Sequence, residues 1–284
     1  MKTMIQSIQT LTLTSILLLG SMSLQACTKA AIVPEEKGQK GDKTLFVENF
    51  DGVSKRPDPA VWMLCKYSDT VWGRYFEHAQ NYENVRVEGG YLKLKADKRD
   101  GIYRNGGIRT IKGFPCNTRV EVKARFTHQV KGGFPAIWQM PIKGKNWPQS
   151  GEIDIMEWIQ STPGEIYQTV HTSYNREHLG RTGATNTQPN RNLDITKDHV
   201  YAVERTEKAL IFYLDGCETW RYENRQTTDE KGNIQYPFAD YDFDIILNFS
   251  LGGKFKGEET WPGDIDDADL PGEMWIDWVK VSKL

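Results

Sequence analysis

The sequence has no strong excess of charge of either sign and no strongly apolar run long enough to span a membrane. Its 284 residues carry 36 Lys and Arg against 38 Asp and Glu, which gives a formal net charge of −2. Nucleic acid is therefore excluded as the expected partner, because phosphate neutralisation needs a clustered excess of Lys and Arg. With 26% charged and 38% hydrophobic residues, the chain is neither a charge-rich disordered polymer nor a polytopic membrane protein.

Cysteine is also scarce. Of the four cysteines, Cys27 lies at the end of an N-terminal leader, which leaves Cys65, Cys116 and Cys217. An odd number cannot pair completely within one chain, so one disulfide plus a thiol and three thiols both stay open. The absence of a CxxC motif, or of His and Cys at zinc spacing, argues against a Cys-based metal site.

The first 27 residues have the features of an export signal. Lys2 is followed by an apolar stretch at residues 11–19, which is too short and too rich in Thr and Ser to span a bilayer. The following Leu24-Gln25-Ala26-Cys27 resembles the lipobox of bacterial lipoproteins, in which the Cys becomes the lipidated first residue. An ordinary secretory signal that happens to contain Cys is the alternative.

This resemblance predicts three segments. Residues 1–26 form a lipoprotein signal peptide, residues 27–42 form the lipidated Cys27 and a flexible tether, and residues 43–284 form one catalytic domain. The protein is then exported and anchored to a membrane by lipid at Cys27, while the domain stays in water.

Alternating apolar and polar residues recur along the body of the chain. Such period-two segments, separated by Gly, Asn and Asp turns, predict strands. They cover residues 85–88, 91–96, 119–126, 209–214, 244–251 and 274–281. Because no long amphipathic helix accompanies them, we expect an all-β antiparallel sandwich or barrel.

One segment concentrates acidic residues. Glu152, Asp154 and Glu157 lie within Gly151-Glu152-Ile153-Asp154-Ile155-Met156-Glu157-Trp158. On a regular strand Glu157 would point away from the other two and into the core, where a lone carboxylate is costly. A one-residue bulge at Ile155-Met156 would bring all three acids to one face.

The bulge makes the distance between the acids testable. Glu152 and Glu157 would be four strand steps apart, about 13 Å between their Cα atoms. Their side chains can then close to the roughly 5–5.5 Å of a retaining glycosidase pair, whereas an inverting pair needs about 6.5–9.5 Å. Asp154 between them can hydrogen-bond a neighbour, and three clustered carboxylates should raise at least one pKa.

Two other interpretations of these acids are a solvated surface and a site for a hard cation such as calcium. The surrounding residues favour a sugar cleft, because aromatic side chains stack on the flat faces of sugars. The chain has nine Trp residues, and several flank the acids, within residues 134–141, at Trp147 and at Trp158.

The run GEIDIMEW resembles the active-site signature of glycoside hydrolase family 16, in the form with one extra residue before the second Glu. That form is typical of laminarinase-like, agarase-like and endo-β-galactosidase members. Further segments match the family in order: NVRVEGGYLKLKA, GGIRTIKGFPCNTRVEVKARF, FPAIWQMP, YLDG, ILNFSLGG and MWIDWVKVSKL. The resemblance implies a concanavalin-like β-jelly roll of two bent antiparallel sheets, a substrate cleft on the concave face, and retaining endo-hydrolysis of β-linked glycans.

The resemblance also implies roles for the acids. Glu152 would be the nucleophile, Glu157 the acid and base, and Asp154 an assisting residue. No cofactor is required for catalysis, and a structural calcium ion is an optional ligand. Glu48, the Gly90 carbonyl and Asp277 match its position loosely.

Six further residues are predicted to bind substrate. Trp138 and Trp147 match family aromatics on the glycone side of the cleavage point, and His171 matches a position beside the catalytic strand. For His171, Arg109 and Asn248 a purely structural role is the alternative. The full set is Trp138, Trp147, His171, Arg109, Asn248 and Trp158.

The chain departs from the laminarinase pattern at residues 72–81, at 172–174 and at Phe255. Its overall likeness is greater to the endo-acting O-glycanases of mucin-degrading gut bacteria, lipoproteins that cut after β-galactose in poly-N-acetyllactosamine chains. An endo-β-1,3-(1,4)-glucanase is the alternative enzyme. A lectin-like glycan-binding lipoprotein is the non-enzyme alternative, and the presence of both Glu residues speaks against it. With one cleft per chain, a monomer is expected.

Overall fold

The structure is a computed structural model in which residues 43–77, 82–186 and 192–284 are described. The predicted signal peptide, tether and Cys27 lie outside the described residues. Across the described part of the chain, no helix has the length and apolar character needed to cross a membrane.

Two large antiparallel sheets make up the fold, as the alternating sequence predicts. The first has nine strands, and its central path runs β14 (Cys217–Glu223), β13 (Ala209–Leu214), β12 (His199–Arg205), β7 (Thr118–Phe126), β18 (Gly272–Lys283), β4 (Tyr91–Arg99) and β3 (Val85–Glu88). Beside this path, β1 (Thr44–Glu48) pairs with β18, and β5 (Ile102–Arg104) pairs with β4.

The second sheet has seven strands. Their order is β11 (Gly183–Asn186), β10 (Tyr167–His171), β9 (Glu152–Glu157), β8 (Gly133–Gln139), β15 (Ile246–Leu251), β6 (Gly106–Thr110) and β2 (Trp62–Leu64). Smaller elements lie in the connections between these strands. They are the helix α1 (Ser173–Leu179), the hairpin β16 (Lys254–Phe255) with β17 (Glu258–Glu259), and the 3₁₀ turn η2 (Asp267–Asp269).

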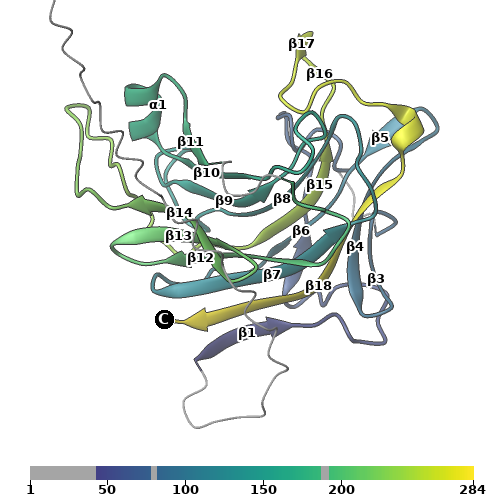
Figure 1. Cartoon of the computed structure of the whole chain (residues 1–284), viewed down its shortest axis with the longest axis horizontal. Helices are drawn as coiled ribbons and strands as arrows, with labels where there is room; N and C mark the ends of the chain where they lie inside the picture. Colours follow the sequence, from purple (N-terminus) through teal and green to yellow (C-terminus); the bar gives the residue numbers. More distant parts are fainter. Residues whose placement is uncertain (1–42, 78–81, 187–191) are drawn as a thin grey trace, which may run out of the picture.

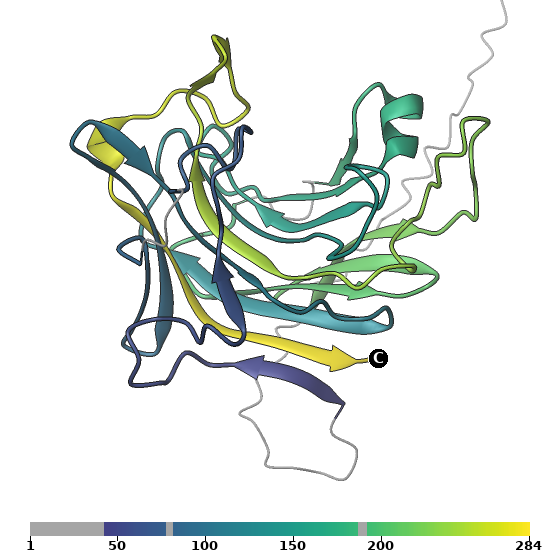
Figure 2. The same ribbon diagram turned by 180° about the vertical axis from the view of Figure 1, so that it is seen from behind.

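The two sheets are bent and lie one over the other (Figure 1). The helix α1 and the β16–β17 hairpin rise on opposite sides of the seven-stranded sheet, and the view from behind shows the same two walls (Figure 2). The two bent antiparallel sheets confirm the predicted all-β jelly roll.

The core lies between the sheets. In β7 every second residue is buried, so Val120, Val122 and Ala124 face inward while the residues between them are partly exposed. The opposing layer contributes Ile137 from β8 and Leu247 from β15 to the same cluster. Burying one face of each sheet in this way is what drives two antiparallel sheets together.

The sequence analysis predicted no long helix, and α1 spans only seven residues. Its start is fixed by Thr172, whose hydroxyl accepts a hydrogen bond from the Asn175 amide at 2.9 Å. Its end is fixed by Gly180 in the left-handed conformation. Short capped helices carry little periodic signal, so only the caps could have indicated this one.

Candidate active site

The predicted bulge is present in β9. Along β8, Trp138 pairs with Asp154 and Ile137 pairs with Met156, which leaves Ile155 without a partner in that ladder. On the other side, Asp154 pairs with Thr169 of β10 and Glu157 pairs with Tyr167. Three residue steps of β9 therefore lie opposite two residue steps of β10. The bulge therefore lies where the conflict between acids and core required it.

The pairing also checks the predicted spacing. Glu152 lies opposite His171 and Glu157 lies opposite Tyr167, two β10 residues that are four positions apart. Five residue steps along β9 thus cover the length of four regular strand steps, about 13 Å. The spacing is the one predicted for side chains that lean together over a sugar.

The bulge sorts the strand into two faces. Ile153, Ile155 and Met156 are fully buried in the core cluster. Glu152, Asp154 and Glu157 line a cavity of about 690 Å³ on the concave side. Without the extra residue, one of the three acids would face the core.

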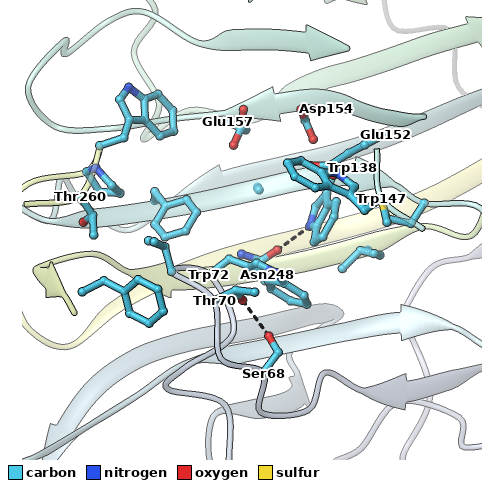
Figure 3. Close-up of a pocket in the computed structure, with 18 of the residues that line it drawn as sticks. Ser68, Thr70, Trp72, Trp138, Trp147, Glu152, Asp154, Glu157, Asn248 and Thr260 are labelled. Atoms are coloured by element: carbon cyan, nitrogen blue, oxygen red, sulfur yellow. Dashed lines mark hydrogen bonds between the residues drawn. The ribbon is translucent and has the colours of Figure 1, made fainter. Parts of the chain in front are cut away.

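Neighbouring strands supply the rest of the cavity floor, and loops supply its sides (Figure 3). Trp138 and Trp147 lie at the Glu152 end of the acid row, and Thr260 lies at the Glu157 end. Besides the acids, the lining consists of Ser68, Thr70, Val71, Trp72, Arg109, Phe134, Ala136, Trp138, Met140, Trp147, Ile246, Asn248, Phe255, Glu258, Glu259, Thr260, Trp261 and Pro262. A cavity with a carboxylate row and six aromatic side chains in its lining suits a sugar chain.

The backbone before Glu152 requires glycine. Gly151 has a φ of +84°, and a Cβ there would lie 2.4 Å from the Phe238 ring. Glu152 then enters β9 partly buried, and its carboxylate accepts a hydrogen bond from the Trp147 indole N–H. That donor favours the ionised carboxylate, which is the form a nucleophile needs.

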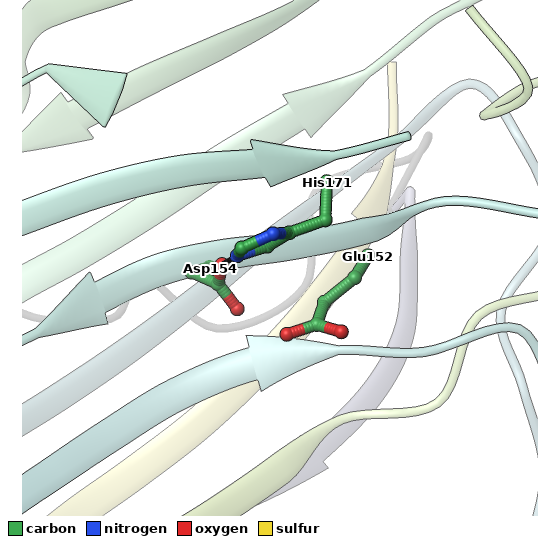
Figure 4. A group of neighbouring side chains, drawn as sticks. All are labelled: Glu152, Asp154 and His171. Carbon is green, nitrogen blue, oxygen red and sulfur yellow. Dashed lines mark ion pairs between the residues drawn. The ribbon is translucent and has the colours of Figure 1, made fainter. Parts of the chain in front are cut away.

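Asp154 is buried between the two glutamates and faces His171 from the next strand. His171 Nε2 lies 3.1 Å from Asp154 Oδ2, and His171 Nδ1 lies 2.8 Å from the Thr182 hydroxyl oxygen. Figure 4 shows the imidazole beside Asp154 with the Glu152 carboxylate close by. His171 is therefore part of the acid cluster, although it does not line the cavity itself.

These three side chains bring one ligand atom each to within 4.8 Å of one another, and among the described residues they are the group that could hold a metal ion. The Trp147 N–H on Glu152 competes with a cation for that carboxylate. We therefore assign the cluster to proton chemistry.

The environment raises the pKa of all three acids, chiefly because burial disfavours the charged forms. The pKa of Glu152 rises to about 8 by burial and the nearby Asp154 charge, against opposing effects of His171 and Trp147. The pKa of Glu157 is raised well above its usual range by burial and by the charges of Asp154 and Glu152. The acids titrate together, and a cluster of this kind keeps a proton available near neutral pH.

Trp138 and Asn248 hold each other on the cavity floor. The Trp138 indole donates to Asn248 Oδ1 at 2.7 Å, and Asn248 Nδ2 donates to the Ser250 hydroxyl at 2.9 Å. The Ser250 hydroxyl donates in turn to the Trp72 carbonyl. Asn248 is therefore placed to orient Trp138 as well as to contact a ligand.

Arg109, a predicted substrate-binding residue, lines the cavity, but its charge is paired. Its Nε donates to Asp244 Oδ2 at 2.7 Å, and Asp244 is 1% exposed. Burial raises the pKa of Asp244 against the opposing effect of Arg109. The pair fixes this end of β6 to the residues before β15.

One predicted substrate residue lies elsewhere. Trp158 follows the acid strand but is 1% exposed, and its ring stacks on Phe126 with centroids 6.3 Å apart in the core. The bulge reverses the alternation, so Trp158 points inward and does not line the cavity. The expectation that Trp158 contacts substrate is wrong.

Two of the predicted calcium residues, Glu48 and Asp277, have other partners. The Glu48 carboxylate accepts hydrogen bonds from the Phe50 amide and the Trp62 indole. Asp277 Oδ2 lies 2.6 Å from the Lys123 ammonium, which competes with a cation for that carboxylate. Calcium binding at these residues stays a prediction.

The two described thiols do not contribute chemistry to the cavity. Cys65 and Cys116 are free. Burial raises the pKa of Cys65 to about 12, so it is an inert thiol.

At the Glu157 end, the cavity wall contains Trp72 and Phe255, which the sequence analysis noted as departures from the laminarinase pattern but did not place at the cavity. The loop around Trp72 and the β16–β17 hairpin meet there, although they are about 180 residues apart. Arg74 joins them by donating to the Lys254 carbonyl at 2.7 Å and to the Gly252 carbonyl. Trp261, 47% exposed, packs edge-on against Tyr167 at 4.9 Å. Only the Trp and Phe content of these loops could have signalled them.

Comparisons with known proteins agree with this geometry. The family described as "Glycosyl hydrolases family 16" matches residues 73–280. A "Beta-glucanase" of Rhodothermus marinus is 30% identical over 250 residues, which cover 84% of this chain and 84% of that protein. A "Keratan-sulfate endo-1,4-beta-galactosidase" of Sphingobacterium multivorum is 30% identical over 236 residues, 80% of this chain, and this chain spans 52% of that protein's length.

Solved structures give the same picture. One described by the words "Prominent members of the human gut microbiota express endo-acting O-glycanases to initiate mucin breakdown" has 57% sequence identity and a TM-score of 0.80, covering 85% of this chain and 99% of that one. A laminarinase from Rhodothermus marinus has 29% identity and a TM-score of 0.70, covering 86% of this chain and 98% of that one.

Proposed function

The chain belongs to glycosyl hydrolase family 16 and is a retaining, endo-acting glycosidase, and from that premise we propose that it is an endo-β-galactosidase. Its proposed substrates are poly-N-acetyllactosamine and mucin-type O-glycans. The observation that carries the catalytic part is the row of Glu152, Asp154 and Glu157 on one face of a bulged strand, at the floor of an aromatic cleft.

Sequence identity supports the galactosidase over the glucanase. The structure described with the endo-acting O-glycanases is 57% identical to this chain, whereas the Rhodothermus laminarinase is 29% identical. The similarity to the keratan-sulfate endo-1,4-β-galactosidase of Sphingobacterium multivorum adds to this. An endo-β-1,3-(1,4)-glucanase is the second candidate, because a "Beta-glucanase" matches 84% of the chain.

In the first chemical step we assign the nucleophile to Glu152. One carboxylate oxygen attacks the anomeric carbon, and the bond from that carbon to the glycosidic oxygen breaks. Glu157 gives its proton to the departing oxygen, so the aglycone leaves as an alcohol and a glycosyl ester forms on Glu152. The raised pKa of Glu157 suits this role, since the acid must hold a proton at the working pH.

In the second step Glu157, now a carboxylate, takes a proton from water. The water oxygen attacks the anomeric carbon and releases Glu152. Two inversions restore the β configuration of the product. Asp154, buried between the two, steadies Glu152 as it loses and regains negative charge.

Product analysis tests the substrate proposal. The domain from residue 43 onward would be incubated with mucin O-glycans, keratan sulfate, agarose, laminarin and mixed-linkage glucan, and products read by mass spectrometry. Glu152→Gln is the matched control. Oligosaccharides with reducing-end galactose support the proposal, and glucose oligomers alone transfer the assignment to a glucanase. Glycan binding without any product would instead favour the lectin-like alternative.

We further propose that the protein is an exported lipoprotein anchored through Cys27 and that its catalytic domain is a monomer. The basis for the anchor is the lipobox-like Leu24-Gln25-Ala26-Cys27. Labelling of cells with a fatty-acid probe should mark the wild-type protein but not Cys27→Ala. Membrane attachment of Cys27→Ala equal to wild type would contradict the anchor, and sedimentation at twice the monomer mass would contradict the monomer.

A further inference from the structure

Trp147 is an exposed residue that makes a hydrogen bond to the nucleophilic carboxylate. Its side chain is 48% exposed, and its indole N–H donates to the Glu152 carboxylate. It lies in the connection between β8 and β9, outside any strand or helix. An exposed ring on a loop keeps one hydrogen bond only if neighbouring side chains restrict its motion.

Among the described residues, two side chains besides Glu152 lie beside the Trp147 ring. The His171 ring lies 5.9 Å away between centroids, and the Arg176 guanidinium lies 5.5 Å from the Trp147 centroid. Both come from one short segment, because His171 ends β10 and Arg176 lies in the middle of α1. That distance is within the range in which a cation attracts an aromatic face.

The helix that carries Arg176 is fixed to the fold. Asn175 is buried, and its Nδ2 donates to the Val170 carbonyl at 3.1 Å. Its Oδ1 accepts from the Tyr222 hydroxyl at 3.2 Å. Because the neighbouring residue is held on both sides, the backbone presents Arg176 to Trp147 from a defined position.

We propose that Arg176 is a positioning residue of the cleavage reaction, holding the Trp147 ring so that its indole N–H stays on the nucleophilic carboxylate of Glu152. This inference rests on the proposed role of Glu152. Arg176 lines no part of the cavity, and it acts on the reaction through Trp147. It is thus distinct from the aromatic residues that line the cavity.

The proposal has a titration signature. Glu152 faces Asp154 and Glu157 on its own strand, His171 on β10 and Trp147 on the preceding loop, and of these Asp154 raises its pKa while His171 and Trp147 lower it. A hydrogen bond from N–H favours the charged carboxylate. Loss of that bond should therefore raise the pKa of Glu152.

An NMR titration tests the inference without any substrate. The protein has nine tryptophans, and labelling them with ¹⁵N gives one indole signal each. The signal missing from Trp147→Phe identifies Trp147, and its shift followed against pH reports the ionisation of the carboxylate it touches. In Arg176→Met, which keeps reach but removes charge, the signal should move upfield and its midpoint should rise by about half a pH unit.

Kinetics supply the second readout. The acidic limb of kcat/KM should move to higher pH in Arg176→Met and in Trp147→Phe, and the double variant should shift no further than Trp147→Phe alone. Arg176→Lys should recover part of the effect. Glu177→Gln, a neighbouring exposed charge on α1 that pairs with Lys231 at 2.6 Å, is the matched control and should leave the limb in place.

Two results would overturn the inference. The first is a Trp147 indole signal in Arg176→Met that titrates as in wild type. The second is an Arg176→Met shift that persists in full on the Trp147→Phe background, which would mean that Arg176 acts on Glu152 through space. If no glycan is cleaved, the NMR arm still decides the role of Arg176, so failure of the proposed function is distinguishable.

Discussion

His171 Nε2 lies 3.1 Å from Asp154 Oδ2 in the interior of the acid row. The other ring nitrogen lies 2.8 Å from the Thr182 hydroxyl oxygen, so both ends of the imidazole have a polar partner. The hydrogen bond at Nδ1 turns the Nε2 edge of the ring towards the carboxylate. His171 does not line the cavity, but its charge lowers the pKa of Glu152 and of Glu157.

Replacing His171 should move the pH profile. Because His171 lowers the pKa of Glu152 and of Glu157, His171→Phe should raise both. The acidic limb of kcat/KM should then move to higher pH, by roughly 0.5–1 unit. Thr182→Val, which removes only the outer partner of the ring, should give a smaller shift in the same direction. A limb that moves to lower pH in His171→Phe would contradict this account.

Glu157→Ala should separate the two chemical steps. Loss of a general acid and base costs about 10²–10⁴ in rate on a natural glycan, whose leaving group is poor. An activated aryl glycoside needs no acid, so the first step should survive, and added azide should enter the space left by the carboxyl and give a glycosyl azide. Retained β configuration in that azide, read by NMR, checks the double displacement. An α-glycosyl azide would contradict the nucleophilic role of Glu152.

Glu152→Gln should stabilise the fold at alkaline pH. The pKa of Glu152 is raised from 4.5 to about 8, so between these values the folded protein binds more protons than the unfolded chain. Stability is then lost as the pH rises through this range, and a residue that cannot ionise avoids the loss. We expect a gain on the order of 2 kcal/mol at pH 8.5, reduced from the full shift because the carboxyl meets the cleft.

Thermal unfolding at pH 4 and pH 8.5 checks this. The two proteins should have similar Tm values at pH 4 and should differ at pH 8.5, with Glu152→Gln the more stable. Glu177→Gln, exposed on α1, should show no such divergence. A Glu152→Gln protein that is less stable than wild type at pH 8.5 would contradict this prediction. It would show that hydrogen bonds to the ionised Glu152 carboxylate offset the free-energy cost of burying its charge.

The sequence carried enough information for the strands and the acid row but not for the walls of the cleft. The bulge followed from a single conflict, since a strand without it would bury Glu157. The same reversal of the alternation turns Trp158 inward, contrary to its predicted contact with substrate. Residues on one strand are related by a fixed period, which is why local pattern sufficed there.

The wall formed by Trp72 and Trp261 depends on contacts between segments far apart in the chain. No period links the two residues, and each lies in an irregular loop or hairpin region. Trp147 and Arg176 meet for the same kind of reason, through a helix only seven residues long. Such contacts follow from the three-dimensional path of the loops, which a single sequence does not specify.

Arg74 should control substrate affinity through that wall. Its guanidinium lies over the Tyr75 ring at 4.6 Å and the Phe255 ring at 5.3 Å while it donates to two carbonyls of the hairpin segment. Arg74→Ala should let the loop around Trp72 and the β16–β17 hairpin move apart, which should raise KM by roughly tenfold. The effect on kcat should be smaller, because the catalytic acids lie on a separate strand.

Lys256→Ala is the matched control for Arg74. Lys256 joins the same two segments through Asp69 at 2.7 Å, but both side chains are 64% exposed. Exposed ion pairs contribute about 0–1 kcal/mol, so KM should change less than threefold. Equal effects of Arg74→Ala and Lys256→Ala on KM would contradict the assigned importance of the Arg74 contacts.

Arg205 should be the most costly arginine to replace. It is 1% exposed, and its guanidinium donates to the backbone carbonyls of Phe238, Tyr241 and Phe114 while lying 4.7 Å from the Phe243 ring. Arg205→Met would leave three carbonyls without these donors, each at about 1–3 kcal/mol. We expect unfolding in urea to show a loss of at least about 3 kcal/mol.

The same variant should also lower activity, because Phe238 packs against Gly151 directly before the nucleophile. Movement of the Phe238 segment therefore reaches Glu152 through one residue of backbone. Arg221→Met, which removes a partly exposed arginine paired with Glu218 on the same sheet, should cost less than about 1 kcal/mol and leave kcat unchanged. If Arg205→Met were as stable and as active as Arg221→Met, the buried guanidinium would not be what holds the loop beneath the nucleophile.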